Sequence, residues 1–309
     1  MNDKKSITDY YYSDERGDAH AVVYRLFPGI EVAFISVHMA DFDFGIFEKD
    51  SLKKYVSIHY CKEGRIEQEV NQEFFYLMPG DCSIDIYAKR KKGFRLPLGH
   101  YHGISIGIDF NEHRSPIIDF WESCGYAPTE ILNHICGVTS HTVLRSSEMV
   151  KIFFDAMYEI NNEQRLEYLR MKLPELFYRL RYLEPDKCNE VRNPVSCTQV
   201  DFVKNVALYI SENINDKITV KRLTQEFGVS DTYLQNAFRG VYGMPVISFI
   251  RIQKMQSAAQ VLIRTNRTIE EIAEAFGYEN ESKFSAAFKR IMGDSPGVFR
   301  KEHSKIRIL

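Results

Sequence analysis

An internal repeat in the last hundred or so residues is the feature that most limits what this chain can fold into. The segment ITVKRLTQEFGVSDTYLQNAFRGVYG is followed by the similar segment RTIEEIAEAFGYENESKFSAAFKRIMG, with matched positions 49 residues apart before a central turn and 50 after it. The matched pairs are Val220 with Ile269, Leu223 with Ile272, Phe227-Gly228 with Phe276-Gly277, Phe238 with Phe288, Gly243 with Gly293 and Phe249 with Phe299. Self-similarity at a fixed spacing indicates one structural unit built twice.

Each unit has the pattern of a helix, a tight turn and a second helix. A threonine can cap the first helix by accepting its free N–H groups, and a glycine can end it in a left-handed conformation. A polar residue then starts the second helix. These residues are Thr219, Gly228 and Ser230 in the first unit, and Thr268, Gly277 and Asn280 in the second.

The outer face of each second helix carries polar side chains suited to DNA. Hydrogen-bonding side chains can read base edges in a major groove, whereas lysine and arginine hold backbone phosphates. The predicted base contacts are Thr232, Gln235, Asn236 and Arg239 in the first unit, and Glu281, Ser282 and Ser285 in the second. The predicted phosphate contacts are Lys283, Lys289 and Arg290. Because Ala286 also faces outward, we expect the second unit to read fewer bases.

A long amphipathic helix is predicted between the two units, from Pro245 to Arg264. Such a spacer would let the two second helices enter successive major grooves about 34 Å apart. The sequence therefore predicts a DNA-binding domain with two helix-turn-helix units.

Charge and composition agree with this division. Residues 199–309 contain 16 Lys and Arg against 12 Asp and Glu, a net charge of +4, and residues 1–198 contain 24 against 30, a net charge of −6. This asymmetry favours nucleic acid meeting only the C-terminal end. Without a long apolar run or a secretory signal, we expect a cytoplasmic protein with no membrane contact. The six scattered cysteines are expected to be free thiols.

The N-terminal half is predicted to be mainly antiparallel strands. Short runs with period-two alternation or tight turns between them lie within residues 20–110, for example Val56 to Cys61 and Gly103 to Ile108. From Ser147 onward the period becomes helical. We expect an α+β multidomain chain: an N-terminal antiparallel β-barrel followed by helices, then an all-α C-terminal domain.

A leucine stripe follows, at Leu166, Leu169, Leu173, Leu176, Leu180 and Leu183. This spacing suits packing against another helix, so the stripe is a candidate dimer interface, although it could equally pack on the chain's own barrel. Pro174 predicts two helices, or a kink, near Leu173. The expected domains are a barrel at 1–146, a dimerisation segment at 147–184, a linker at 185–198 and the DNA-binding domain at 199–309.

From about Val200 to Lys301 the chain resembles the AraC/XylS family of bacterial transcription regulators. The resemblance rests on Leu223, Phe227-Gly228-Val229-Ser230, Tyr233-Leu234, Phe238, Gly243, Arg251, Ala258, Ile269, Ile272-Ala273, Phe276-Gly277-Tyr278, Phe284, Phe288-Lys289, Gly293 to Pro296 and Phe299-Arg300. It implies seven helices that bind double-stranded promoter DNA. The N-terminal half looks like the cupin-type sensor of that family, which implies a homodimer, a small-molecule effector of unknown identity inside the barrel, and RNA polymerase as a possible partner. No cofactor is expected.

Two alternatives remain open. His100 and His102 form an H-x-H pair, with His59 or His113 as a third ligand, as in a metal-dependent cupin enzyme tethered to DNA. No carboxylate stands at a convincing offset, so no metal site is assigned. Arg65 and Arg95 could hold an anionic effector or form ion pairs. The barrel could also serve only oligomerisation or partner binding.

Overall fold

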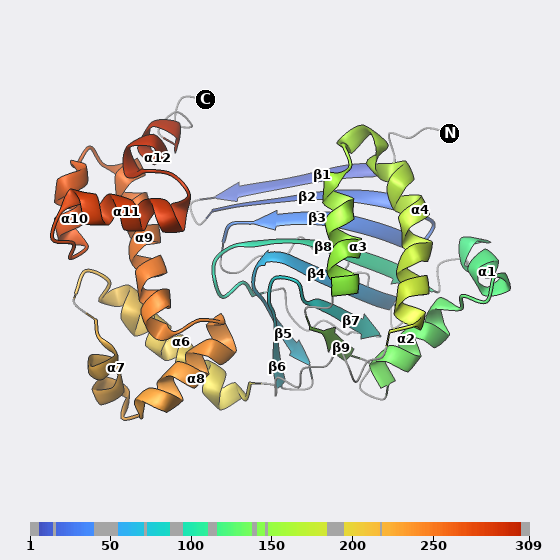
Figure 1. The fold of residues 1–309 in the computed structure, drawn as a ribbon, viewed down its shortest axis with the longest axis horizontal. Coiled ribbons are helices and arrows are strands. Elements are labelled where there is room, and N and C mark those ends of the chain that lie inside the picture. The colour runs from blue at the N-terminus through green and yellow to red at the C-terminus, as the bar shows by residue number, and fades with distance from the viewer. Residues whose placement is uncertain are drawn as a thin grey trace. The chain divides into compact units, whose positions relative to one another are not determined.

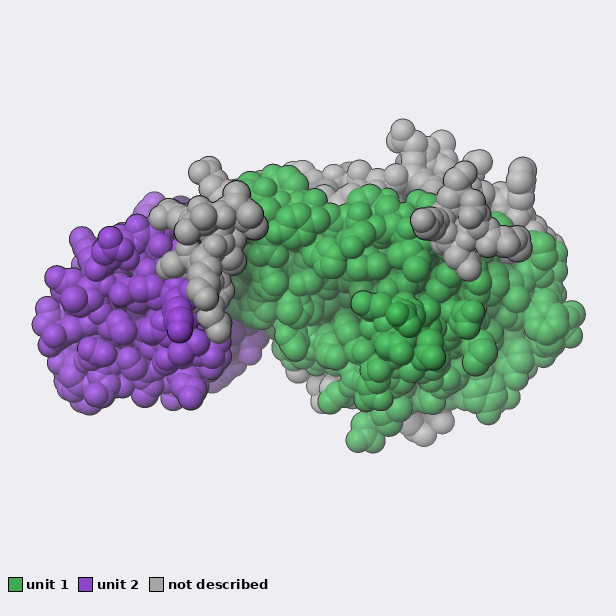
Figure 2. Space-filling view, turned by 90° about the horizontal axis from the view of Figure 1, so that it is seen from above, with its two compact units in different colours: residues 1–194 green, residues 195–309 purple. Residues whose placement is uncertain are grey.

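The chain divides into two compact units, Met1–Pro194 and Val195–Leu309 (Figure 2). The computed structural model describes residues 6–14, 17–39, 55–70, 73–86, 95–110, 116–137, 141–145, 148–183, 195–216 and 218–303. Among these residues, none of the helices combines the length and the apolar character needed to cross a membrane.

The first unit is built on a seven-stranded sheet in the order β1-β2-β3-β8-β4-β7-β9 (Figure 1). All its pairs are antiparallel. The strands are β1 (Ile7–Asp14), β2 (Gly17–Phe27), β3 (Ile30–Val37), β4 (Tyr55–Gly64), β7 (Cys82–Ile86), β8 (Tyr101–Asp109) and β9 (His141–Leu144). A separate hairpin consists of β5 (Ile66–Val70) and β6 (Glu73–Leu77). The predicted antiparallel strands are confirmed.

The described sheet is open, with β1 and β9 at its edges, rather than closed into the barrel that we expected. Helices provide the reason, because an apolar face covered by helices is buried without closure. Ile58, Ile84 and Ile106 share a core cluster with helices α1 (Pro116–Ser123), α2 (Pro128–Cys136), α3 (Glu148–Glu159) and α4 (Asn162–Arg181). In Figure 1, α3 and α4 lie across this face of the sheet.

Helix α4 excludes one of the two alternatives that Pro174 predicted. It runs from Asn162 to Arg181 as one helix with Pro174 inside it, not as two helices. The side chain of Asn161 caps its start by accepting from the N–H of Gln164 at 3.0 Å. All six residues of the leucine stripe are buried in the core of the first unit. The free energy gained by burying these side chains outweighs the backbone hydrogen bond that a proline removes from a helix.

The described part of the second unit consists of seven helices. They are α6 (Cys197–Glu212), α7 (Val220–Phe227), α8 (Asp231–Tyr242), α9 (Val246–Arg264), α10 (Ile269–Ala275), α11 (Glu281–Met292) and α12 (Pro296–His303). Helix α9 is the predicted spacer, and its 19 residues span about 28 Å. Phe249 near its start packs on Phe238 of α8, whereas Leu262 near its end joins the core around Phe284 and Phe288 of α11.

Candidate nucleic-acid interface

Turns of defined geometry set the direction of α8 and α11. Gly228 has φ of 63° and Gly277 has φ of 78°, a left-handed conformation that glycine adopts without strain. The hydroxyl of Ser230 then accepts from the N–H of Tyr233 at 3.2 Å. Likewise, the side chain of Asn280 accepts from the N–H of Lys283 at 2.9 Å. The caps predicted from the sequence are therefore present in both units.

The outer face of α8 displays three of its four predicted base-contact residues. Thr232, Asn236 and Arg239 are exposed, whereas Leu234 and Phe238 on the opposite face are fully buried. Residues 232, 236 and 239 are neighbours on one side of a helix because they are four and three positions apart. The structure thus places a continuous polar surface, with an amide at its centre, on the outside of α8.

Gln235, the fourth residue, is half-buried and turned toward the next helix. Its side-chain oxygen accepts a hydrogen bond from the backbone N–H of Val246 at 3.3 Å. Helix α9 begins after Pro245, which offers no side-chain cap. Gln235 therefore supplies the missing cap, a role that sequence reasoning missed. The available signal was a helix start whose N-cap residue, a proline, has no side-chain group that accepts a hydrogen bond.

The outer face of α11 is more basic than that of α8. Glu281, Ser282, Lys289 and Arg290 are exposed, and Ser285 is half-buried. The exposed residue at the position equivalent to Asn236 is Ala286, whose methyl group can form no hydrogen bond. At this position α11 lacks the hydrogen-bonding group that Asn236 provides on α8, and fewer base contacts by α11 stay a prediction.

The three predicted phosphate contacts differ in how they are engaged within the protein. Lys283 pairs with Glu279 one turn earlier, and this pair lowers the pKa of the Glu279 carboxyl. Lys289 and Arg290 are exposed, and neither forms an ion pair with any of the described residues. These two side chains are the ones available to an incoming phosphate.

Lys254 on α9 bonds to the loop before α7 and to the end of α10. Its ammonium donates to the backbone oxygen of Asp216 at 3.2 Å and to that of Phe276 at 3.1 Å. Burial lowers the pKa of Lys254. Because one acceptor lies in the loop before α7 and the other ends α10, this side chain holds both segments on α9.

The candidate metal ligands of the first unit do not gather as expected. The ring of His59 is fully buried and its Nδ1 lies 2.7 Å from the hydroxyl of Ser105, while His113 lies outside the described residues. Nδ1 of His100 lies 3.4 Å from the carbonyl of Leu98. In the described part of the chain, no three His, Cys, Asp or Glu side chains are placed to hold a metal ion together.

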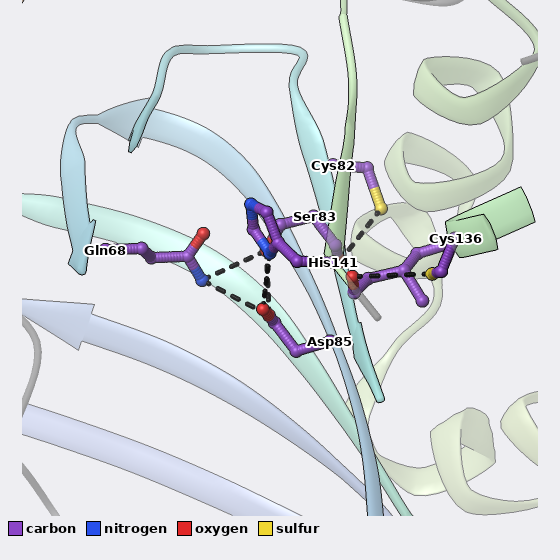
Figure 3. Close-up of polar contacts among 7 residues, drawn as sticks. Gln68, Cys82, Ser83, Asp85, Cys136 and His141 are labelled. Carbon is purple, nitrogen blue, oxygen red and sulfur yellow. Dashed lines mark hydrogen bonds and ion pairs between the residues drawn. The ribbon is translucent and has the colours of Figure 1, made fainter. Parts of the chain in front are cut away.

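A buried polar layer lies on the sheet face opposite the helices. Nδ1 of His141 on β9 is 2.6 Å from the carboxylate of Asp85 on β7 (Figure 3). The amide of Gln68 on β5 donates to the hydroxyl of Ser83 at 3.0 Å. These four side chains are polar, but the interior beside them is also apolar, because a cluster of buried residues there includes Ile66, Leu77 and Val143. Arg95, a candidate for an anionic effector, is 4.0 Å from Glu67.

Two exposed helices set by duplicated turns define a DNA-binding domain with two helix-turn-helix units. A helix-turn-helix family model matches residues 223–302. The transcriptional activator AarP of Providencia stuartii is 28% identical over 102 residues, which cover 33% of this chain and 76% of AarP. The F1 operon positive regulatory protein of Yersinia pestis is 35% identical over 99 residues, 32% of this chain and 33% of that protein.

A solved structure is also similar in this region. A probable AraC family transcriptional regulator from Rhodopseudomonas palustris is 25% identical with a TM-score of 0.31, covering 33% of this chain and 97% of that one. The matches to these two relatives each cover about a third of this chain, and this chain spans only about a third of the length of the Yersinia protein. The match over residues 223–302 confirms the helix-turn-helix domain that the sequence of this chain predicted.

Proposed function

We propose that this protein is a sequence-specific transcription regulator, not an enzyme, and that it binds promoter DNA through α8 and α11. The observation that carries the proposal is the polar surface of Thr232, Asn236 and Arg239 on a helix whose opposite face is fully buried. In this assignment α8 is the principal reader of bases. Helix α11 contributes through Glu281, Ser282 and Ser285, and it binds phosphate through Lys289 and Arg290.

Selection from a random duplex library tests this function without a known operator. Purified full-length chain and residues 195–309 are each carried through selection, and binding to the enriched duplex is measured against competitor DNA. We expect a common enriched motif and an affinity at least 1,000-fold above that for competitor, as about 10³–10⁷ is typical of specific binding. Failure of both proteins to enrich any motif would remove the proposal.

A small-molecule effector is assigned to the first unit in the same proposal. The polar layer of Gln68, Ser83, Asp85 and His141 supports a ligand that forms hydrogen bonds, such as a sugar, over a fatty acid. A ligand that binds only the folded state raises the melting temperature. A thermal-shift screen of sugars, fatty acids, bile acids and aromatic acids tests this, with Gln68→Leu as the variant. A hit whose shift is unchanged in the variant would contradict a site at this layer.

The proposal also includes a homodimer formed by the segment 147–184, joined by the linker 185–198 to the DNA-binding residues 199–309. Since the leucine stripe is buried inside its own unit, a dimer must use another surface of α4. Met171, Tyr178 and Tyr182 are 75%, 50% and 65% exposed at positions seven and four apart. This exposed apolar stripe supports a contact between two copies, because such stripes mark association surfaces.

A further inference from the structure

Four polar side chains meet at one end of the sheet, each on or directly after a different strand. Asp18 lies on β2, His38 directly follows β3, His102 lies on β8 and Glu63 on β4. These four strands are consecutive in the order of the sheet. The four side chains are between 35% and 59% exposed, so solutes have access to them.

Each histidine is held by a carboxylate through the same ring nitrogen. Nδ1 of His38 is 3.1 Å from a carboxylate oxygen of Asp18, and Nδ1 of His102 is 3.2 Å from one of Glu63. The remaining ring nitrogens face each other, with Nε2 of His38 only 3.1 Å from Nε2 of His102. The two imidazoles thus point at one place from opposite sides.

The hydrogen-bond roles follow from this geometry. A carboxylate accepts, so each Nδ1 carries the proton and each Nε2 of a neutral ring presents a lone pair. Two lone pairs 3.1 Å apart repel each other unless a metal ion lies between them or one ring is protonated at Nε2 and donates to the other. Carboxylates bonded to the outer nitrogen of an imidazole are the usual support for a metal-ligating histidine, since they fix its tautomer and orientation.

We infer that His38 and His102 form a binding site for a divalent transition-metal ion of the zinc type. Zinc binds imidazole nitrogen at about 2.0–2.1 Å. With the two Nε2 atoms 3.1 Å apart, an ion at that distance from both has an N–Zn–N angle of roughly 100°, close to the tetrahedral value. Imidazole suits zinc, copper and nickel, whereas magnesium and calcium prefer oxygen.

This site differs from the H-x-H arrangement considered from the sequence. It uses His102 but pairs it with His38, which is 64 residues away, in place of His100. Because the described residues contribute only two direct ligands, water or an exchangeable molecule would fill the remaining coordination positions of the ion. A bound ion would connect β3 to β8 directly, and β2 and β4 through the carboxylates.

Titration of untagged, metal-free full-length protein with Zn²⁺ and separately with Ni²⁺ tests the inference. We expect the wild-type protein to bind one more ion than the histidine variants do. His38→Ala and His102→Ala should each lose this site. Glu63→Gln and Asp18→Asn keep both imidazoles and should bind about 10–100-fold more weakly. Mg²⁺ should not bind.

His20→Ala is the matched control, since this exposed histidine also pairs with a carboxylate, that of Asp9 at 2.6 Å. It should bind as wild type does. Circular dichroism checks that each variant is folded. The inference is overturned if the wild-type protein binds no ion. In that case a proton shared by the two Nε2 atoms would account for their short distance. The inference is equally overturned if folded His38→Ala and His102→Ala bind like wild type.

Discussion

Gln235 and Asn236 are adjacent amides on α8 with different surroundings. The oxygen of Gln235 caps α9, whereas Asn236 is exposed at the centre of the outer face. Both residue types can pair with adenine in a major groove. Their environments nevertheless differ, so we expect replacement of Asn236 to affect DNA binding alone and replacement of Gln235 to affect the stability of the fold as well.

Asn236→Ala should weaken binding to the selected duplex by about 1–3 kcal/mol and relax the preference at one position. The melting temperature should stay unchanged because the side chain is exposed. Affinity for a panel of single-base variants of the duplex, with the melting temperature beside it, measures both effects. An equal loss on random DNA would show that this face does not read bases.

Gln235→Ala should lower the free energy of unfolding of the second unit by about 0.5–2 kcal/mol, the range for a lost helix cap. DNA affinity should fall as well, because α8 and α9 lose a direct connection. Denaturant unfolding of residues 195–309 gives the stability change, and Asn236→Ala is its control. If both variants unfold like wild type, the hydrogen bond to Val246 has no role in stability.

Lys289→Ala should weaken binding to all duplexes alike, since phosphates carry no sequence information. The slope of log affinity against log salt should fall by about one. Lys283→Ala should change the slope less, because Lys283 is already paired with Glu279. The measurement is the affinity of each variant at several salt concentrations, for selected and for random DNA. A loss confined to the selected duplex would assign Lys289 to base reading.

At the scale of elements, α4 has two faces with different roles. The leucine stripe is in the core of the first unit, and Met171 is on the opposite, exposed side of the same helix. Leu173 and Met171, two residues apart, therefore provide a matched pair. One tests packing within a single copy and the other tests association of two copies.

Leu173→Ala should lower the free energy of unfolding by about 2–5 kcal/mol, as expected for a leucine buried at 1% exposure. Met171→Glu should instead leave the fold intact and shift the protein from dimer to monomer. Thermal unfolding and sedimentation velocity on both variants distinguish the effects. A Met171→Glu variant that sediments like wild type would place the dimer contact elsewhere or show that none forms.

At the scale of the whole molecule, the two compact units have separate cores. Calorimetry should therefore show two unfolding transitions. Leu173→Ala should move only the transition of the first unit, and Phe288→Ala only that of the second, since each residue is buried in one core. A shift of both transitions by either substitution would mean that the units unfold as one body.

The sequence by itself determined most of the second unit, because its repeat, its caps and its turn glycines are local signals. Thr219, Ser230, Thr268 and Asn280 all cap the helices that they were predicted to start. A cap hydrogen bond joins residues three positions apart, and a left-handed glycine depends on the residues beside it. Such features can be read directly from residue order.

Only the tertiary structure decided which surfaces are covered. It buried the leucine stripe, kept α4 in one piece despite Pro174 and left the sheet open under its helices. It also turned Gln235 toward Val246 and brought His38 to face His102. These outcomes depend on groups that are far apart in sequence, and their burial and pairing free energies override the local preferences that a single sequence reveals.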